Sequence, residues 1–166
     1  MGATGWIDTD WQALWAATDG AMPQALLASL AQQASDADLA RLLEELREST
    51  LWQHRPWVAL WMVYLLGVCR YEPAVALLWQ LLQERHQEAL ILEALLEALG
   101  RLLHDDHARL RQLLSDSAGS TQGHSYGYGI FEGFTALDED DIAFLKQSVE
   151  STSAKNCQEL AILSPL

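Results

Sequence analysis

The chain of 166 residues carries 23 Asp and Glu against 10 Lys and Arg, a formal net charge of −13, and half of it is apolar. This apolar content excludes a disordered acidic chain, and the shortage of cations argues against a nucleic-acid partner, whose phosphates need Lys and Arg. Leu (31) and Ala (23) far outnumber Val (5) and Ile (5), which favours helix over strand. We therefore predict an all-α protein, and the length predicts one domain over residues 1–166.

The N-terminal residues, Met1 to Trp6, contain no basic segment followed by an apolar one, so we expect no secretory signal. The uncharged run over residues 56–69 is shorter than the ~20 residues of a membrane-spanning helix, and it predicts a buried core helix. Cys69 and Cys157 form no CxxC pair and are expected to be structural free thiols. A cytoplasmic protein without a membrane partner is the expectation.

Apolar residues recur at helical spacing along most of the chain, interrupted by Pro, Asp and Gly. Asp36, Asp105 and Asp138 each precede such a stretch and are predicted to cap a helix. The predicted helices cover residues 8–19, 23–34, 37–49, 55–69, 73–86, 88–104, 106–116 and 138–151, with a further short helix at 156–163.

An internal repeat is found when the chain is compared with itself at a shift of 33 residues. Apolar positions of the helix at 55–69 then coincide with apolar positions of the helix at 88–104. Repeats of this period are typical of stacked helix pairs, each of which needs its neighbours to bury an apolar face. The aligned pairs include Val58 with Ile91, Ala59 with Leu92, Met62 with Leu95, Val63 with Leu96 and Leu66-Gly67 with Leu99-Gly100.

The run Ala98-Leu99-Gly100, followed by His104-Asp105-Asp106-His107-Ala108 and spaced leucines, resembles the consensus of HEAT-like repeats. Leu65-Leu66-Gly67 with Pro73-Ala74-Val75 resembles it more loosely, and together the matches cover roughly residues 36–116. The resemblance implies a short right-handed α-solenoid of about four antiparallel helix pairs. In such a fold Gly67 and Gly100 are packing glycines, at points where two helices approach closely.

The fourth helix pair, 106–116 with 138–151, is interrupted by an insertion at residues 117–137. Long irregular insertions in compact domains are usually functional or disordered. This insertion holds five of the ten glycines and several aromatic rings, which favour burial. We expect Tyr126, Tyr128 and Phe131 to contact a partner.

The repeat also aligns a charged stripe of residues on one helix with an apolar stripe on another. On the helix at 88–104, Glu93, Glu97 and Arg101 recur at a spacing of four residues and are predicted to face solvent. The positions 33 residues earlier are Leu60, Tyr64 and Val68. An apolar stripe on that surface is either covered by another segment or is a binding patch, and the sequence leaves both readings open.

Two charged clusters each allow a structural and a functional reading. His104-Asp105-Asp106-His107 has metal-ligand chemistry, but the repeat register places it at a helix junction, where capping explains the acids. Asp138, Glu139, Asp140 and Asp141 open a predicted helix and complement its dipole. Four acids exceed what a cap requires, so a contact for a basic partner is a second interpretation.

Seven tryptophans are many for this length. Trp11 and Trp15 lie four residues apart, as do Trp57 and Trp61, so each pair shares one face of a helix. Packing between helix layers is the ordinary role of such pairs, and an aromatic pocket for a small ligand is the alternative.

No catalytic motif is present: the chain has no GxSxG elbow, no phosphate loop and no Cys–His pair, so we expect neither enzymatic activity nor a cofactor. Small acidic chains of this kind are similar to adaptor and inhibitor proteins, among them bacterial immunity proteins that neutralise a cognate toxin. This resemblance implies a non-catalytic module that binds a basic protein. The residues expected to bind it are Tyr126, Tyr128, Phe131, Asp138, Glu139, Asp140, Asp141, Glu93, Glu97 and Arg101.

The alternative is a ligand-handling or enzymatic HEAT-like protein. The phycobilin lyases are one such family, and by that resemblance the Trp-rich half would line a pocket. A metal-dependent protein using His104, Asp105 and His107 is another form of this alternative. HEAT-like DNA glycosylases share the repeat, but their DNA contacts need a basic face, and this chain has only two lysines.

Overall fold

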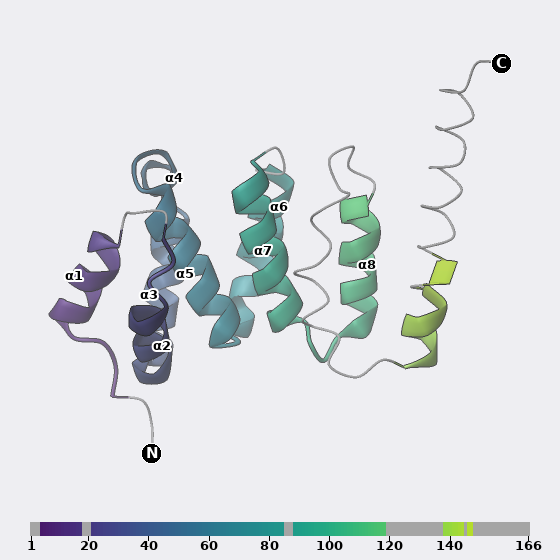
Figure 1. Cartoon of the computed structure of the whole chain (residues 1–166), viewed down its shortest axis with the longest axis horizontal. Coiled ribbons are helices and arrows are strands. Elements are labelled where there is room, and N and C mark those ends of the chain that lie inside the picture. Colours follow the sequence, from purple (N-terminus) through teal and green to yellow (C-terminus); the bar gives the residue numbers. More distant parts are fainter. Residues whose placement is uncertain (1–3, 18–20, 85–87, 119–137, 145, 148–166) are drawn as a thin grey trace.

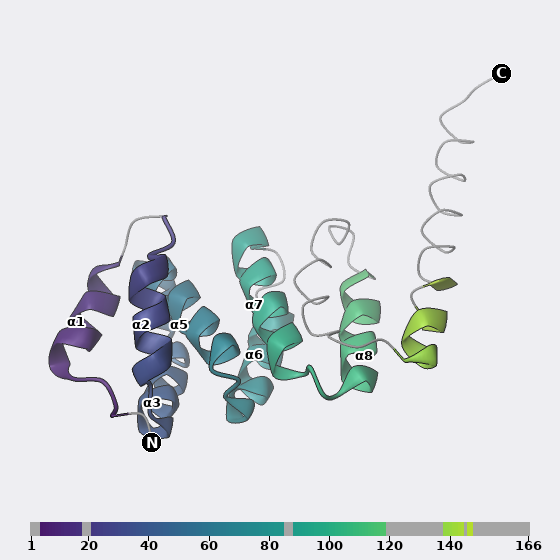
Figure 2. The ribbon, with the colours of Figure 1, turned by 60° about the horizontal axis from the view of Figure 1, so that its bottom comes forward.

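The computed structural model of the protein describes residues 4–17, 21–84, 88–118, 138–144 and 146–147. All regular secondary structure in these ranges is helical, which confirms the all-α prediction. Groups of helices are stacked along the long axis: α1 lies at one end, α2 to α5 come next, then α6 packed against α7, then α8, and residues 138–147 lie at the other end (Figure 1), and a second view keeps this arrangement (Figure 2). The predicted helix at 156–163 and Cys157 lie outside the described residues.

The predicted helices within the described residues are present, with ends that differ by up to three residues. Residues 139–144 and 146–147 are helical as well. The named elements are α1 (Asp8–Ala16), α2 (Gln24–Gln33), α3 (Asp36–Leu46), α4 (Ser49–His54), α5 (Pro56–Val68), the 3₁₀ turn η1 (Glu72–Ala74), α6 (Val75–Glu84), α7 (Ala89–Leu102) and α8 (His107–Ala118).

Helix α4 is a difference from the sequence prediction, which continued α3 to residue 49 and placed a connection after it. The chain leaves α3 after Leu46 and becomes extended at Glu48. Trp52 is buried and its indole N–H donates to the Leu46 carbonyl at 2.9 Å. That carbonyl belongs to the last turn of α3, where no helical partner exists. A tertiary hydrogen bond therefore fixes the bend, and helical periodicity does not reveal it.

The helix caps differ from prediction by one residue in two cases. Ser35 rather than Asp36 caps α3, since its hydroxyl accepts the Asp38 N–H at 3.3 Å. At α8 the acceptor is Asp106 rather than Asp105, with its carboxylate 3.2 Å from the Arg109 nitrogen. Asp138 was predicted correctly, because its carboxylate accepts the Asp141 N–H at 2.8 Å. In each case the acceptor lies three residues before its donor, the usual capping distance.

Helix α5 is the centre of the fold. Nine of its residues are buried, from Val58 to Gly67, because it contacts α1, α2, α3, α4 and α7. A helix that is apolar on all sides is stable only when neighbours cover all of it. None of the helices in the described part of the chain has the length and apolar character needed to span a membrane.

The positions that the 33-residue repeat aligns are buried in both helices. Val58, Met62 and Leu66 on α5 are fully buried, and so are Leu95 and Leu99 on α7. The two helices meet closely at Gly67, where a Cβ would lie 2.9 Å from the Ala98 Cα. Gly67 is therefore a packing glycine, as predicted.

Candidate functional site

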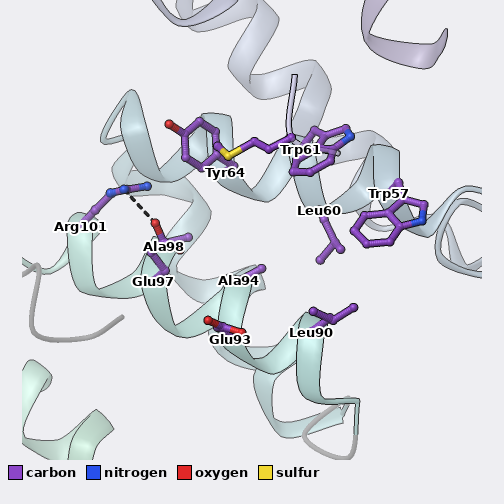
Figure 3. A pocket seen from close by; sticks show the side chains of 11 residues that line it. Trp57, Leu60, Trp61, Tyr64, Leu90, Glu93, Ala94, Glu97, Ala98 and Arg101 are labelled. Atoms are coloured by element: carbon purple, nitrogen blue, oxygen red, sulfur yellow. Dashed lines mark ion pairs between the residues drawn. The ribbon is translucent and has the colours of Figure 1, made fainter. Parts of the chain in front are cut away.

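A groove of about 200 Å³ lies between α5 and α7, and Met22 also lines it. Figure 3 shows Trp57 opposite Leu90 at one end and Tyr64 near Arg101 at the other, so the two helices run in the same direction. The lining residues are Met22, Trp57, Leu60, Trp61, Tyr64, Leu90, Glu93, Ala94, Glu97, Ala98 and Arg101. The two stripes that the repeat brings into register thus form the two walls of one groove.

The α5 wall is aromatic. Trp57 and Trp61 stack with ring centroids 5.9 Å apart, as their spacing of four residues along α5 predicts. Trp61 is buried, and its indole N–H donates to the Ala17 carbonyl at 2.9 Å. This bond holds the Trp61 ring in one orientation, so the wall is preformed.

The α7 wall is charged. Glu97 and Arg101 form an ion pair at 2.8 Å, and the Arg101 guanidinium lies 5.2 Å from the centre of the Tyr64 ring. Arg101 thus bridges the two walls at the Tyr64 end of the groove (Figure 3). Glu93 is exposed and takes part in no ion pair among the described residues. On the α7 wall, the Glu97 carboxylate is therefore paired with Arg101, whereas the Glu93 carboxylate is available to a partner.

The groove also exposes apolar surface. Leu90 is 59% exposed and Met22 38% exposed, two of the few large apolar side chains of the described residues that face solvent. Of the predicted apolar stripe, Leu60 is buried, Tyr64 is half-buried and Val68 is 36% exposed. The stripe is therefore partly covered: Leu60 and Tyr64 line the groove beside α7, whereas Val68, its most exposed member, does not line it.

A second cluster joins residues 138–141 to α8. Asp141 is fully buried: one of its carboxylate oxygens accepts from His107 Nδ1, and the other from Arg111 Nη1 at 2.5 Å. Burial opposes ionisation of Asp141, but the hydrogen bonds from His107, from the Asp138 N–H and from Arg111 outweigh it and hold the Asp141 pKa at about 2. The Asp141 carboxylate raises the His107 pKa in return. We call His107, Arg111, Asp138 and Asp141 the α8 clamp.

The α8 clamp includes the one set of converging metal-ligand residues in the described part of the chain: His107, Asp138 and Asp141. Both oxygens of Asp141 already accept hydrogen bonds from cationic or polar donors, and Arg111 supplies a positive charge at the centre. The donor set therefore fits an internal ion pair better than a divalent cation, which would face Arg111 across the shared carboxylate.

His104 and Asp105 lie apart from this cluster, so the structure does not assemble His104, Asp105 and His107 as one ligand set. His104 Nδ1 lies 3.1 Å from the Arg101 carbonyl, and its Nε2 lies 3.0 Å from Asp105 and 3.1 Å from Arg70. These residues line a wider cavity of about 770 Å³ beside η1 and the start of α8, where acids and bases alternate. The mixed charge favours no single class of ligand.

The remaining predicted contacts fall into three groups. Of the four consecutive acids, Glu139 and Asp140 are exposed, Asp138 caps its helix, and Asp141 belongs to the α8 clamp. Tyr126, Tyr128 and Phe131 lie outside the described residues, as does the insertion apart from residues 117–118, which end α8. Sequence reasoning missed Met22 and Leu90 as groove residues, because each joins the groove only through tertiary packing.

Burial raises the pKa of the Cys69 thiol, which lies 3.7 Å from the Ala31 carbonyl oxygen. This environment disfavours the thiolate, which is the nucleophilic form of cysteine.

Comparisons with protein-family models, with curated proteins and with solved structures found no match to this chain.

Proposed function

We propose that the protein is a non-catalytic binding module of the HEAT-like α-solenoid type, which holds a basic protein partner in the α5–α7 groove. The observation that carries the proposal is the groove itself: a rigid aromatic wall opposite an acidic wall, with exposed Leu90 at its mouth. Aromatic anchors in preformed grooves supply much of the energy of protein interfaces, and surface carboxylates speed the association of basic partners.

Three features support the solenoid form of the proposal. The aligned repeat positions are buried in both α5 and α7. These two helices lie side by side and run in the same direction, as second helices of successive repeats do (Figure 3). The elements also succeed one another along the long axis (Figure 1). The specific role that we favour is an immunity-type neutraliser or adaptor, with exposed Glu139 and Asp140 as a second acidic contact.

The size of the groove favours a protein partner over a cofactor. Its volume of about 200 Å³ lies below the ~300–1,000 Å³ of typical small-molecule sites. It accommodates one or two large side chains rather than a pigment.

The experiment is a selection of displayed random peptides on the wild-type protein and on the variant Ala94→Phe. Ala94 is half-buried in the groove, so a phenyl ring there fills it. Ala28→Phe is the matched control, since Ala28 is exposed on α2 outside the groove. We expect wild type and Ala28→Phe to enrich the same peptides, apolar residues flanked by Lys or Arg, and Ala94→Phe to lose them. Equal enrichment on all three proteins contradicts the proposal.

The stacked tryptophans support a second candidate function, the binding of an open-chain tetrapyrrole as in bilin-lyase-like proteins. Titration with biliverdin tests it. Saturable quenching of tryptophan fluorescence that is lost in Trp57→Leu would favour this function over the first.

A further inference from the structure

We propose that the groove recognises one apolar side chain, the anchor, and one cation of its partner, about one helical turn apart. Glu97 and the Tyr64 ring form a position for a second cation, and Arg101 of the protein itself occupies that position. This inference rests on the proposed function, because it names the chemistry of the partner segment. It assigns different tasks to Glu93 and Glu97, which the sequence pattern treats as equivalent.

The anchor position follows from exposure. Leu90 is 59% exposed and lies opposite Trp57 at one end of the groove (Figure 3), and Met22, which also lines the groove, is 38% exposed. An apolar side chain placed against Leu90 removes apolar surface of Leu90 from water, which contributes roughly 25 cal/mol per Å² of buried apolar surface.

The cation position follows from the charges on α7. Glu93 is one turn after Leu90, about 4.5 Å along the helix axis, and it forms no ion pair among the described residues. A Lys or Arg one turn from the partner's anchor therefore reaches Glu93. The exposed carboxylate and the net charge of −13 both favour a cation there.

The role of Arg101 follows from its contacts with Glu97 and Tyr64. Its guanidinium pairs with Glu97 and lies over the Tyr64 ring, which are the two partners that an arriving cation would use. While Arg101 holds them, the Tyr64 end is closed to a second cation. Its removal takes one cation away from Glu97 and from the Tyr64 ring face, which favours a cation of the partner at this end.

The experiment titrates 15-residue, tryptophan-free Ala/Gln peptides against the full chain, read by tryptophan fluorescence. Each peptide carries one Phe and, four residues before or after it, Lys, Gln or Glu. We expect the Lys peptides to bind best. Glu93→Gln should weaken the Lys peptide about two- to five-fold, the range of an exposed ion pair, and leave the Gln peptide unchanged.

The variant Arg101→Met keeps most of the side-chain length without the charge, and Arg101→Lys keeps the charge. We expect Arg101→Met to strengthen binding of a peptide with a second Lys, four residues beyond the first, by about two- to five-fold. Arg101→Lys should behave as wild type, and circular dichroism checks that each variant is folded.

The outcomes separate this inference from the proposed function. Groove binding that does not distinguish Lys from Gln, or an Arg101→Met variant that binds the two-lysine peptide no better than wild type, overturns the inference and keeps the groove as the binding site. No binding of any peptide overturns both.

Discussion

Arg70 has a left-handed backbone, with φ of +52°, immediately after α5. The Arg70 N–H donates to the Gly67 carbonyl and the Tyr71 N–H to the Leu66 carbonyl, each at 3.1 Å. This pair of bonds is a Schellman motif, in which the residue at the position of Arg70 is usually glycine. Arginine therefore carries a conformational strain that glycine would not.

From this strain we predict that Arg70→Gly stabilises the protein by about 1 kcal/mol relative to Arg70→Ala. Both variants lose the contact between Arg70 and His104, so their difference isolates the backbone effect. Urea unfolding followed by circular dichroism measures it. An alanine variant as stable as the glycine variant would show that the backbone relaxes at this turn.

Gly67 shows the opposite effect of a side chain. Alanine is the better helix former, but its Cβ would lie 2.9 Å from the Ala98 Cα and 3.0 Å from the Ala98 Cβ. We predict that Gly67→Ala destabilises the fold by about 1–2 kcal/mol, since overpacking outweighs helix propensity. Adding Ala98→Gly should recover part of the loss. Thermal unfolding of the two single variants and the double variant tests this coupling.

At the scale of elements, the α8 clamp holds residues 138–147 through a buried carboxylate. Asp141, with its pKa near 2, stabilises the folded state above pH ~4, and this contribution is lost as the pH falls toward 2. His107, with its raised pKa, stabilises it fully below about pH 6.5, and this contribution is lost as the pH rises through the raised value. The clamp is therefore strongest between these limits.

We predict that amide hydrogen exchange of residues 139–144, corrected for its intrinsic pH dependence, is slowest near pH 5.5 and faster at pH 8.5. The variant His107→Gln should abolish this difference, because a neutral amide does not titrate. Asp141→Asn removes the nearer of the two carboxylates beside Arg111, with Asp138 left at 3.7 Å, and should open the segment at every pH. If the corrected exchange does not change with pH in the wild-type protein, His107 does not hold the segment through its charge.

The sequence predicted those parts of the fold that depend on local periodicity. The 33-residue repeat identified residues of both walls of the groove. Helical spacing places Leu60 and Tyr64 on one face of α5, and the repeat places Glu93 and Glu97 on the equivalent face of α7. It did not predict α4, whose start depends on the bond from Trp52 to Leu46, or the clamp, where His107 and Asp141 are 34 residues apart. Contacts of this kind arise from tertiary packing and leave no periodic signal.

At the scale of the whole molecule, the acidic charge is unevenly distributed. Residues 52–104, which supply all of the groove except Met22, hold 4 basic and 5 acidic residues, whereas residues 105–166 hold 4 and 10. Long-range attraction should therefore raise the association rate of a basic partner, while short-range groove contacts set its dissociation rate.

This division predicts a kinetic difference between two variants. Asp140→Lys, on the exposed acidic segment, should slow association with a selected basic peptide and reduce its salt dependence, with little effect on dissociation. Leu90→Ala should speed dissociation and leave association nearly unchanged. Surface plasmon resonance at two salt concentrations separates the effects, and Ile7→Ala, which removes an exposed apolar side chain outside the groove, is the control for Leu90→Ala. Equal dissociation rates for the Leu90 and Ile7 variants would contradict a role for the groove mouth.

The central claim is that the partner occupies the α5–α7 groove. Its most direct test is two-dimensional NMR of the tryptophan indole N–H groups during titration with the Phe/Lys peptide. Trp57 and Trp61 line the groove, whereas Trp6, Trp11 and Trp52 are buried elsewhere and serve as internal references. We predict that the Trp57 and Trp61 resonances shift in proportion to occupancy while those of Trp6, Trp11 and Trp52 stay in place. Shifts confined to these reference tryptophans, or no shift at saturating peptide, would contradict the claim.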